Sequence, residues 1–269
     1  YNPFLFDVVH LPFPEGHGKN TIEAFRKLLS TRANDIAAFI CEPLVLGAGG
    51  MLMYEASVLK ALYNLCSDYG VFFIADEVMT GWGRTGTRFA CEQAGIVPDI
   101  LCLSKGLTGG YLPLAVTLCS GDIYRAFYSK DRAKTFFHSS SYTGNAIACA
   151  SALAALELWD EEPVMERIAN IGTWHGQNMV ALAARPDVGN IRQCGTIAAF
   201  DVVDPDNSGY LSNIGPRLQE FYLNNGVLLR PLGNTVYIMP PYCITKDELE
   251  TIYDTITRSL DYIRNAPSQ

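Results

Sequence analysis

The chain has 269 residues, of which 49% are hydrophobic and 18% are charged, a composition typical of a globular enzyme of about two domains. The formal net charge is −8 at pH 7, and Lys and Arg form no basic stripe. We therefore expect neither nucleic acid nor a membrane surface as a partner, and we favour small-molecule ligands.

The eight cysteines are spread through apolar or small-residue contexts, without a C-x-x-C pair or a neighbouring set of histidines. This distribution favours reduced thiols in a cytoplasmic protein over a disulfide framework or a zinc site, and we expect no bound metal. The sequence contains no apolar run of membrane-spanning length and no signal peptide, and it begins at Tyr1 without Met. From that start we expect the true N-terminus to be missing.

Between about residues 20 and 123, helical stretches alternate with short apolar strands, which predicts a mostly parallel sheet covered by helices. We expect strands at residues 36–40, 71–75, 100–103 and 115–118. The apolar spacing of residues 54–69, followed by Gly70, predicts a helix, and the small residues of 145–159 predict another.

Beyond Glu161 the pattern changes to one of mixed helices and strands. We expect helices at 163–184, 213–224 and 246–263, a strand at 196–203, and paired strands through 227–238. We interpret residues 161–269 as a small α+β domain and residues 1–160 as part of a larger α/β domain.

Charged residues follow two of the predicted strands. Asp76 and Glu77 come after one strand, and Lys105 comes after another, directly before a glycine-rich turn. Since ligands of open parallel sheets bind beyond the carboxyl ends of the strands, these residues are candidates for catalysis. An ordinary ion pair is the alternative. Carbanion chemistry on pyridoxal phosphate needs such a lysine to form the imine and such an acid to keep the ring nitrogen protonated.

The motifs at residues 74–86, 98–100 and 104–106 resemble the signature of the class III aminotransferases, and the resemblance extends over essentially the whole chain. It implies a fold type I pyridoxal-phosphate-dependent transferase, with a large domain of mostly parallel sheet, present only in part, and a small C-terminal α+β domain. Family members carry more than a hundred further residues before the position of Tyr1, so we expect the N-terminal part of the family's chain to be absent.

The resemblance also assigns residues to roles. Lys105 is the expected Schiff-base lysine, Asp76 the partner of the pyridinium nitrogen, and Val78 an apolar wall behind the ring. Ser140 and Ser141 are expected to bind the cofactor's phosphate across the interface of a homodimer with shared active sites. A plain helix N-cap is the alternative for these serines.

Two arginines are the expected substrate residues. Arg230 would hold the substrate's carboxylate, because a guanidinium can grip a carboxylate through two hydrogen bonds, although it could equally cap a turn. Arg84 would line the same site or only support its glycine-rich loop. Glu42, before Pro43, is expected to order the loop that follows it. His138 is interpreted as a structural histidine.

Within the class, the sequence most resembles the branch of biotin biosynthesis. Residues 236–239 lack the arginine that ornithine, acetylornithine and 4-aminobutyrate members carry in this stretch. We therefore expect 7-keto-8-aminopelargonate as the acceptor, and either S-adenosylmethionine or lysine as the amino donor. The alternatives are another ω-aminotransferase, an inactive fragment that serves only as a folding or interaction unit, and, more weakly, a nucleotide-binding protein. The third glycine of a dinucleotide fingerprint is replaced by Leu52.

Overall fold

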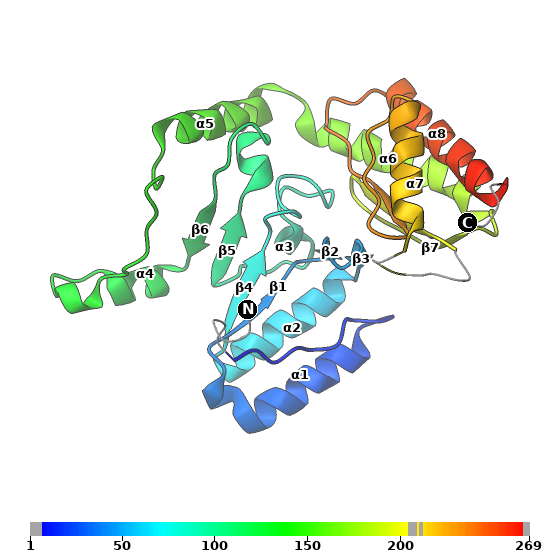
Figure 1. Ribbon diagram of the computed structural model, residues 1–269. Helices are drawn as coiled ribbons and strands as arrows, with labels where there is room; N and C mark the ends of the chain where they lie inside the picture. The colour runs from blue at the N-terminus through cyan, green and yellow to red at the C-terminus, as the bar shows by residue number, and fades with distance from the viewer. Residues whose placement is uncertain (1–6, 204–208, 210–211, 266–269) are drawn as a thin grey trace.

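The computed structural model describes residues 7–203, 209 and 212–265 (Figure 1). The N-terminal half begins with α1 (Lys19–Arg32), η2 (Ala33–Asp35), β1 (Ala38–Cys41), the short strands β2 (Val45–Leu46) and β3 (Leu52–Met53), and α2 (Ala56–Tyr69). It continues with β4 (Phe72–Asp76), α3 (Ala90–Gln93), β5 (Ile100–Leu103), η3 (Lys105–Thr108) and β6 (Val116–Cys119).

The second half of the chain begins after β6. This part contains α4 (Gly121–Phe127), η4 (Arg132–Lys134), α5 (Ala146–Glu161), α6 (Val164–Ala183), β7 (Val188–Cys194), β8 (Ile197–Val202), α7 (Ile214–Asn224), β9 (Thr235–Ile238) and α8 (Lys246–Asn265).

The first sheet has the strand order β1-β4-β5-β6. The β1/β4 and β4/β5 pairs are parallel, and β6 joins as an antiparallel edge. The prediction of a mostly parallel sheet is therefore confirmed. In the β4/β5 register Asp76 lies opposite Cys102, so the ends of these two strands are level with each other.

Helix α2 packs on this sheet because its apolar residues recur at helical spacing. The buried positions are Val58, Leu59, Leu62, Leu65 and Cys66, and they share one core with Phe73 of β4. The helix ends where Gly70 adopts a left-handed conformation with φ of 67° and its N–H bonds back to the last turn. The predicted helix and its stop signal are thus confirmed.

The second sheet is antiparallel, with the order β7-β8-β9. Its central strand β8 is buried on both faces, which its alternation explains. Ile197 and Ala199 join the core beneath the first sheet, whereas Ala198, Phe200 and Val202 face the core formed with α6, α7 and α8. One strand thus ties the C-terminal sheet to both cores, and the division of the chain at residue 160 stays a prediction.

One expectation for this region is wrong, and one strand was missed. Residues 227–238 do not form paired strands: only Thr235–Ile238 is a strand, and it pairs with β8. Val227 and Leu229 are buried in extended chain without a strand ladder, so burial alone produced the apolar signal. Conversely, β7 was not predicted, because its polar residues conceal an edge strand held by backbone pairing.

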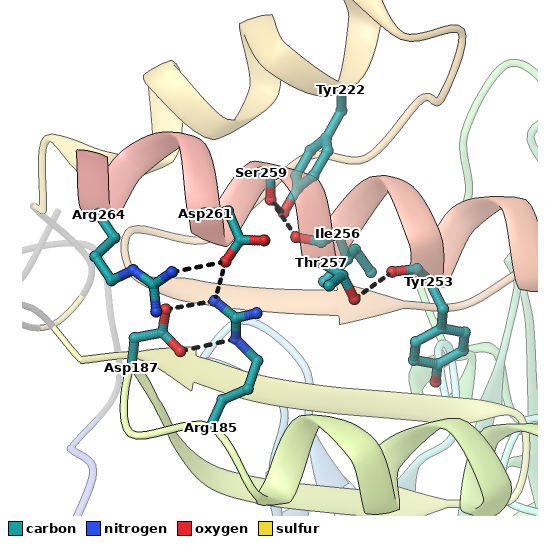
Figure 2. A network of polar contacts seen from close by, with 9 residues as sticks. All are labelled: Arg185, Asp187, Tyr222, Tyr253, Ile256, Thr257, Ser259, Asp261 and Arg264. Carbon is teal, nitrogen blue, oxygen red and sulfur yellow. Dashed lines mark hydrogen bonds and ion pairs between the residues drawn. The ribbon is translucent and has the colours of Figure 1, made fainter. Parts of the chain in front are cut away.

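The C-terminal helix is fastened by a polar cluster (Figure 2). Arg185 donates to both oxygens of Asp187, at 2.9 and 2.8 Å, and to Asp261 of α8 at 2.8 Å. The paired geometry makes this a well-oriented ion pair. It holds the end of α8 against the turn between α6 and β7.

The connection from α4 to α5 extends away from the first sheet (Figure 1). Apart from the half-buried Ile123, residues 121–144 are exposed throughout. None of the helices in the described part of the chain combines the length and apolar content needed to cross a membrane.

Candidate functional site

The candidate site lies where β4 and β5 end. Asp76 is the last residue of β4, and Lys105 opens the 3-10 helix η3 two residues after β5 ends. Because parallel strands place their carboxyl ends at one edge, both residues lie at the same edge of the sheet. Asp76 is half-buried and Lys105 is exposed, and neither forms a salt bridge with any residue that the structure describes. The ordinary ion pair considered from the sequence is thus not formed here.

The two consecutive acids at the end of β4 have different environments. Asp76 accepts a hydrogen bond at Oδ1 from the N–H of the half-buried Val78, at 3.1 Å. Glu77 is fully buried and accepts from the N–H groups of Ala90 and Cys91, at 2.7 and 2.9 Å. Burial raises the pKa of Glu77, and these two hydrogen bonds oppose the rise. Glu77 therefore anchors α3, while Asp76 faces a more open environment.

Strained backbone is concentrated at this edge. Lys105 has a φ of 39°, in the left-handed region that L-residues rarely adopt. Leu44 and Trp82, which lie in the loops after β1 and β4, also have positive φ values of 65° and 58°. Each such residue costs about 1–2 kcal/mol, and such strain is commonly retained at functional sites.

The lysine turn and the loop after β4 are in direct contact. A Cβ at Gly106 would lie 2.8 Å from Cβ of Trp82, so only glycine fits after Lys105 without displacing the tryptophan. The buried Leu103 and Leu107 complete this contact with Trp82. The segments that carry Asp76 and Lys105 are thus packed against each other as one unit.

Arg84 lies in the same loop as Trp82 but faces the C-terminal part of the chain. Its Nη1 donates to the carbonyl of Pro240 at 2.6 Å, and its guanidinium carbon lies 4.8 Å from the ring centre of Tyr242. The Tyr242 hydroxyl in turn donates to the carbonyl of Trp82 at 2.5 Å. These contacts support the loop, and they leave further guanidinium N–H groups without a partner among the described residues.

Glu42 orders the loop that follows it, as expected from the sequence. Its Oε2 accepts from the N–H of Gly47 at 3.0 Å. The far end of the loop is held by Arg192 of β7, which donates to the carbonyls of Gly50 and Met51 at 2.6 and 2.8 Å and pairs with Asp201. A cavity of about 550 Å³ adjoins this contact, but the charges of Arg192 and Asp201 in its wall are already paired with each other.

The remaining candidates form no hydrogen bond or ion pair with Asp76 or Lys105 among the described residues. Ser140 and Ser141 are exposed on the segment before α5, where the N–H of Ser140 bonds to Thr143 Oγ1 at 3.0 Å. The N-cap of α5 is Asn145 rather than either serine, so the plain N-cap interpretation is wrong for them. Arg230 is exposed, and its side chain has no hydrogen bond to a residue within the described ranges.

The sequence patterns assign no functional role to Tyr242, Thr196 and His175, which hold the Arg84 loop in place. His175 and Thr196 enter only as parts of the expected helix at 163–184 and strand at 196–203, and Tyr242 lies outside every expected element. Their contacts with Arg84, or with each other, join positions that are far apart in the chain. No local spacing could have identified them.

Comparison with known proteins decides the family. Residues 1–260 match the family described as aminotransferase class-III. The chain belongs to the class-III aminotransferases. Its relatives include proteins named adenosylmethionine-8-amino-7-oxononanoate aminotransferase from Synechococcus elongatus, 45% identical over 98% of this chain and 63% of the relative, and from Nitratidesulfovibrio vulgaris, 41% identical over 95% of this chain and 50% of the relative.

Solved structures of similar aminotransferases agree with this assignment. The enzyme of the same name from Methanocaldococcus jannaschii superposes with a TM-score of 0.91 at 33% identity, covering 97% of this chain and 61% of the other. An ω-transaminase from Pseudomonas jessenii, described in complex with PMP, superposes with a TM-score of 0.82 at 31% identity, covering 90% of this chain and 54% of the other. The fold type I architecture is therefore confirmed, and the chain spans about half to two thirds of the length of these relatives.

Proposed function

We propose that this chain forms part of a pyridoxal-phosphate-dependent aminotransferase that transfers an amino group to 7-keto-8-aminopelargonate. The observation that carries the proposal is the position of Asp76 and Lys105 at one sheet edge in a class-III aminotransferase. The names of the relatives, which refer to 8-amino-7-oxononanoate, support the acceptor.

The residues at the sheet edge suit the cofactor. Pyridoxal phosphate, when bound, supplies an electron sink that stabilises negative charge on the carbon next to the transferred nitrogen. The exposed Lys105 amine has no acidic partner among the described residues and is free to attach to a carbonyl. In this proposal the Nζ of Lys105, once the substrate has displaced it, accepts the proton from the carbon next to the transferred nitrogen.

Asp76 is assigned the pyridinium nitrogen. The N–H of Val78 occupies Oδ1 and fixes the carboxylate's orientation, which leaves Oδ2 without a donor among the described residues. An ionised carboxylate at that position favours a protonated ring nitrogen through close opposite charge. The half-buried Val78 side chain is assigned the apolar wall behind the ring.

Arg230 and Arg84 are assigned the substrate's carboxylate. Both retain guanidinium donors without partners in the described part of the chain, and a carboxylate can accept two such donors at once. Strand β9 carries no arginine, since its residues are Thr235, Val236, Tyr237 and Ile238. This favours the biotin-pathway acceptor over 4-aminobutyrate or ornithine.

Ser140 and Ser141 are assigned the cofactor's phosphate in a second copy of the protein. They are exposed on a segment that extends away from the first sheet, and a contribution to a neighbouring subunit requires such exposure (Figure 1). We accordingly propose a cytoplasmic homodimer with shared active sites.

A general ω-aminotransferase is the second candidate, favoured by the likeness to the Pseudomonas jessenii ω-transaminase. The two candidates differ in the acceptor that they use. The test incubates the protein and pyridoxal phosphate with 7-keto-8-aminopelargonate and either S-adenosylmethionine or lysine, and measures 7,8-diaminopelargonate by mass spectrometry. The choice of donor is decided by which incubation gives product.

Two variants sharpen the assay. Lys105→Arg keeps the charge but removes the reactive amine and is expected to abolish product, whereas Lys246→Arg, on the exposed side of α8, is expected to leave it unchanged. Ready turnover of 4-aminobutyrate without turnover of the biotin precursor would reject the proposed acceptor. If no product forms with S-adenosylmethionine, with lysine or with 4-aminobutyrate, the alternative of an inactive fragment is supported.

A further inference from the structure

The C-terminal part of the chain holds the backbone of Arg84 through a contact that no sequence motif predicts. The carbonyl of Arg84 accepts two hydrogen bonds from the fully buried Thr196, one from its N–H at 3.0 Å and one from Oγ1 at 3.2 Å. The neighbouring Gly195 has a φ of +57°, and a Cβ there would lie 2.3 Å from the nitrogen of Gly86. The turn between β7 and β8 is therefore docked backbone to backbone on the Arg84 loop.

A buried histidine fixes this turn from behind. His175 of α6 is 0% exposed, with Nε2 at 3.2 Å from the carbonyl of Thr196 and Nδ1 at 2.7 Å from the hydroxyl of Tyr253 in α8. Because a carbonyl can only accept, Nε2 carries the ring hydrogen, and the neutral ring then accepts from Tyr253 at Nδ1. The hydrogen bonds run in one direction from Tyr253 through His175 and Thr196 to Arg84.

The side chain of Arg84 is held by the same part of the chain. Its guanidinium bonds to the Pro240 carbonyl and lies over Tyr242, and Tyr242 bonds to the carbonyl of Trp82. The C-terminal part thus grips the loop at the backbone and at the side chain. The loop cannot change its position without breaking the contacts of Thr196.

We propose that His175 and Tyr253 are positioning residues that, through Thr196, hold Arg84 in the orientation in which it binds the carboxylate of the substrate. The inference rests on the proposed function in one respect, the role of Arg84 toward a carboxylate. It adds that binding at the sheet edge depends on two buried residues of α6 and α8 that touch neither substrate nor cofactor.

The matched experiment compares Tyr253→Phe with Tyr222→Phe. Both tyrosines are buried in the same core, and each substitution removes one hydroxyl. Within the described ranges, however, the Tyr222 hydroxyl bonds only to Ser259 and has no hydrogen bond to the Arg84 loop. Figure 2 shows that Tyr222, from α7, reaches Ser259 of α8, whereas Tyr253 lies further along α8 itself. A purely structural role predicts the same behaviour for both variants.

Two quantities are measured on the full chain. The first is the hydrogen-exchange rate of the Thr196 amide, which donates to Arg84. The second is the dissociation constant of pimelate, used as an aliphatic carboxylate probe, with Arg84→Ala as the reference for lost binding. Tyr253→Phe is expected to raise both by about fivefold, and Tyr222→Phe to change neither, although both variants lower the unfolding midpoint.

His175 provides the rescue test. His175→Gln retains an N–H donor for the Thr196 carbonyl and is expected to bind pimelate more tightly than His175→Leu, which has none. Equal exchange rates in the two tyrosine variants would overturn the inference, and so would unchanged pimelate binding in both Tyr253→Phe and His175→Leu. If Arg84→Ala binds pimelate as well as the unmodified chain, the carboxylate role of Arg84 fails and the inference fails with it.

The failure of the proposed cofactor chemistry is recognised separately. Attachment of pyridoxal phosphate to Lys105 is measured on the unmodified chain. Absent attachment counts against the proposed function, while the exchange and pimelate measurements still decide whether His175 and Tyr253 position Arg84.

Discussion

The burial of His175 predicts a specific loss of stability in mild acid. Desolvation lowers the pKa of this histidine from 6.5 to about 4, and the hydrogen bond to Thr196 only partly opposes that effect. The unfolded chain therefore takes up a proton at a higher pH than the folded chain does. The contribution of His175 to the free energy of unfolding is complete above about pH 6.5 and is lost as the pH falls toward 4.

The size of the effect follows from the two pKa values. At 1.36 kcal/mol per pKa unit, the full contribution is about 3 kcal/mol, and about 2 kcal/mol of it is lost by pH 5. A typical domain is stable by only about 5–15 kcal/mol, so this loss is readily measured.

The assay is urea denaturation at several pH values between 7.5 and 5, for the unmodified chain and for His175→Gln. The raised pKa of Glu77 makes a contribution of the opposite sign. The difference between the two proteins removes this contribution, because it is common to both. The variant is expected to be less stable at pH 7.5 and to lose about 2 kcal/mol less than the unmodified chain on going to pH 5. Parallel curves for the two proteins would refute the assignment of His175 as a buried neutral histidine.

Two further predictions concern the scaffold of the site. Gly195→Ala is expected to lower the free energy of unfolding by about 3 kcal/mol or more, because the new Cβ would lie 2.3 Å from the Gly86 nitrogen. Gly95 has the same φ of +57° but nothing within 4 Å of the position that a Cβ would take, so Gly95→Ala is expected to cost about 1 kcal/mol. Urea denaturation of both variants separates the clash from the backbone strain, and equal costs would contradict the tight contact. Asn145→Ala is expected to lower the free energy of unfolding by about 1 kcal/mol, since Oδ1 of Asn145 accepts from two N–H groups at the start of α5. Asn145→Asp is the control that keeps the cap, and an unchanged urea midpoint for the alanine variant would show that the cap adds no stability.

The elements that carry the candidate site could be predicted from the sequence because their signals are local. Residues 100–103 form a strand at the predicted positions, and α2 ends at Gly70 as expected. Asp76 and Lys105 were found because polar residues that follow short apolar strands gather at one edge of a parallel sheet. Local patterns of this kind require no knowledge of the tertiary structure.

What the sequence could not reveal depends on contacts between distant residues. Strand β7 contains Asn190, Arg192 and Gln193 and forms through pairing with β8, so its own residues give little β signal. The apolar residues Val227 and Leu229 are buried without a strand ladder, which misled the prediction of paired strands. The link between His175 and Tyr253 spans 78 positions, and neither residue stands in a motif.

A single labelling experiment tests whether Lys105 carries pyridoxal phosphate. The protein is mixed with pyridoxal phosphate, its visible spectrum is recorded, the mixture is reduced with borohydride, and the modified peptide is located by mass. We expect a visible absorbance band and a label on Lys105, which the Lys105→Arg variant lacks and the Lys246→Arg variant retains. A label spread over surface lysines, or no label at all, would contradict this expectation.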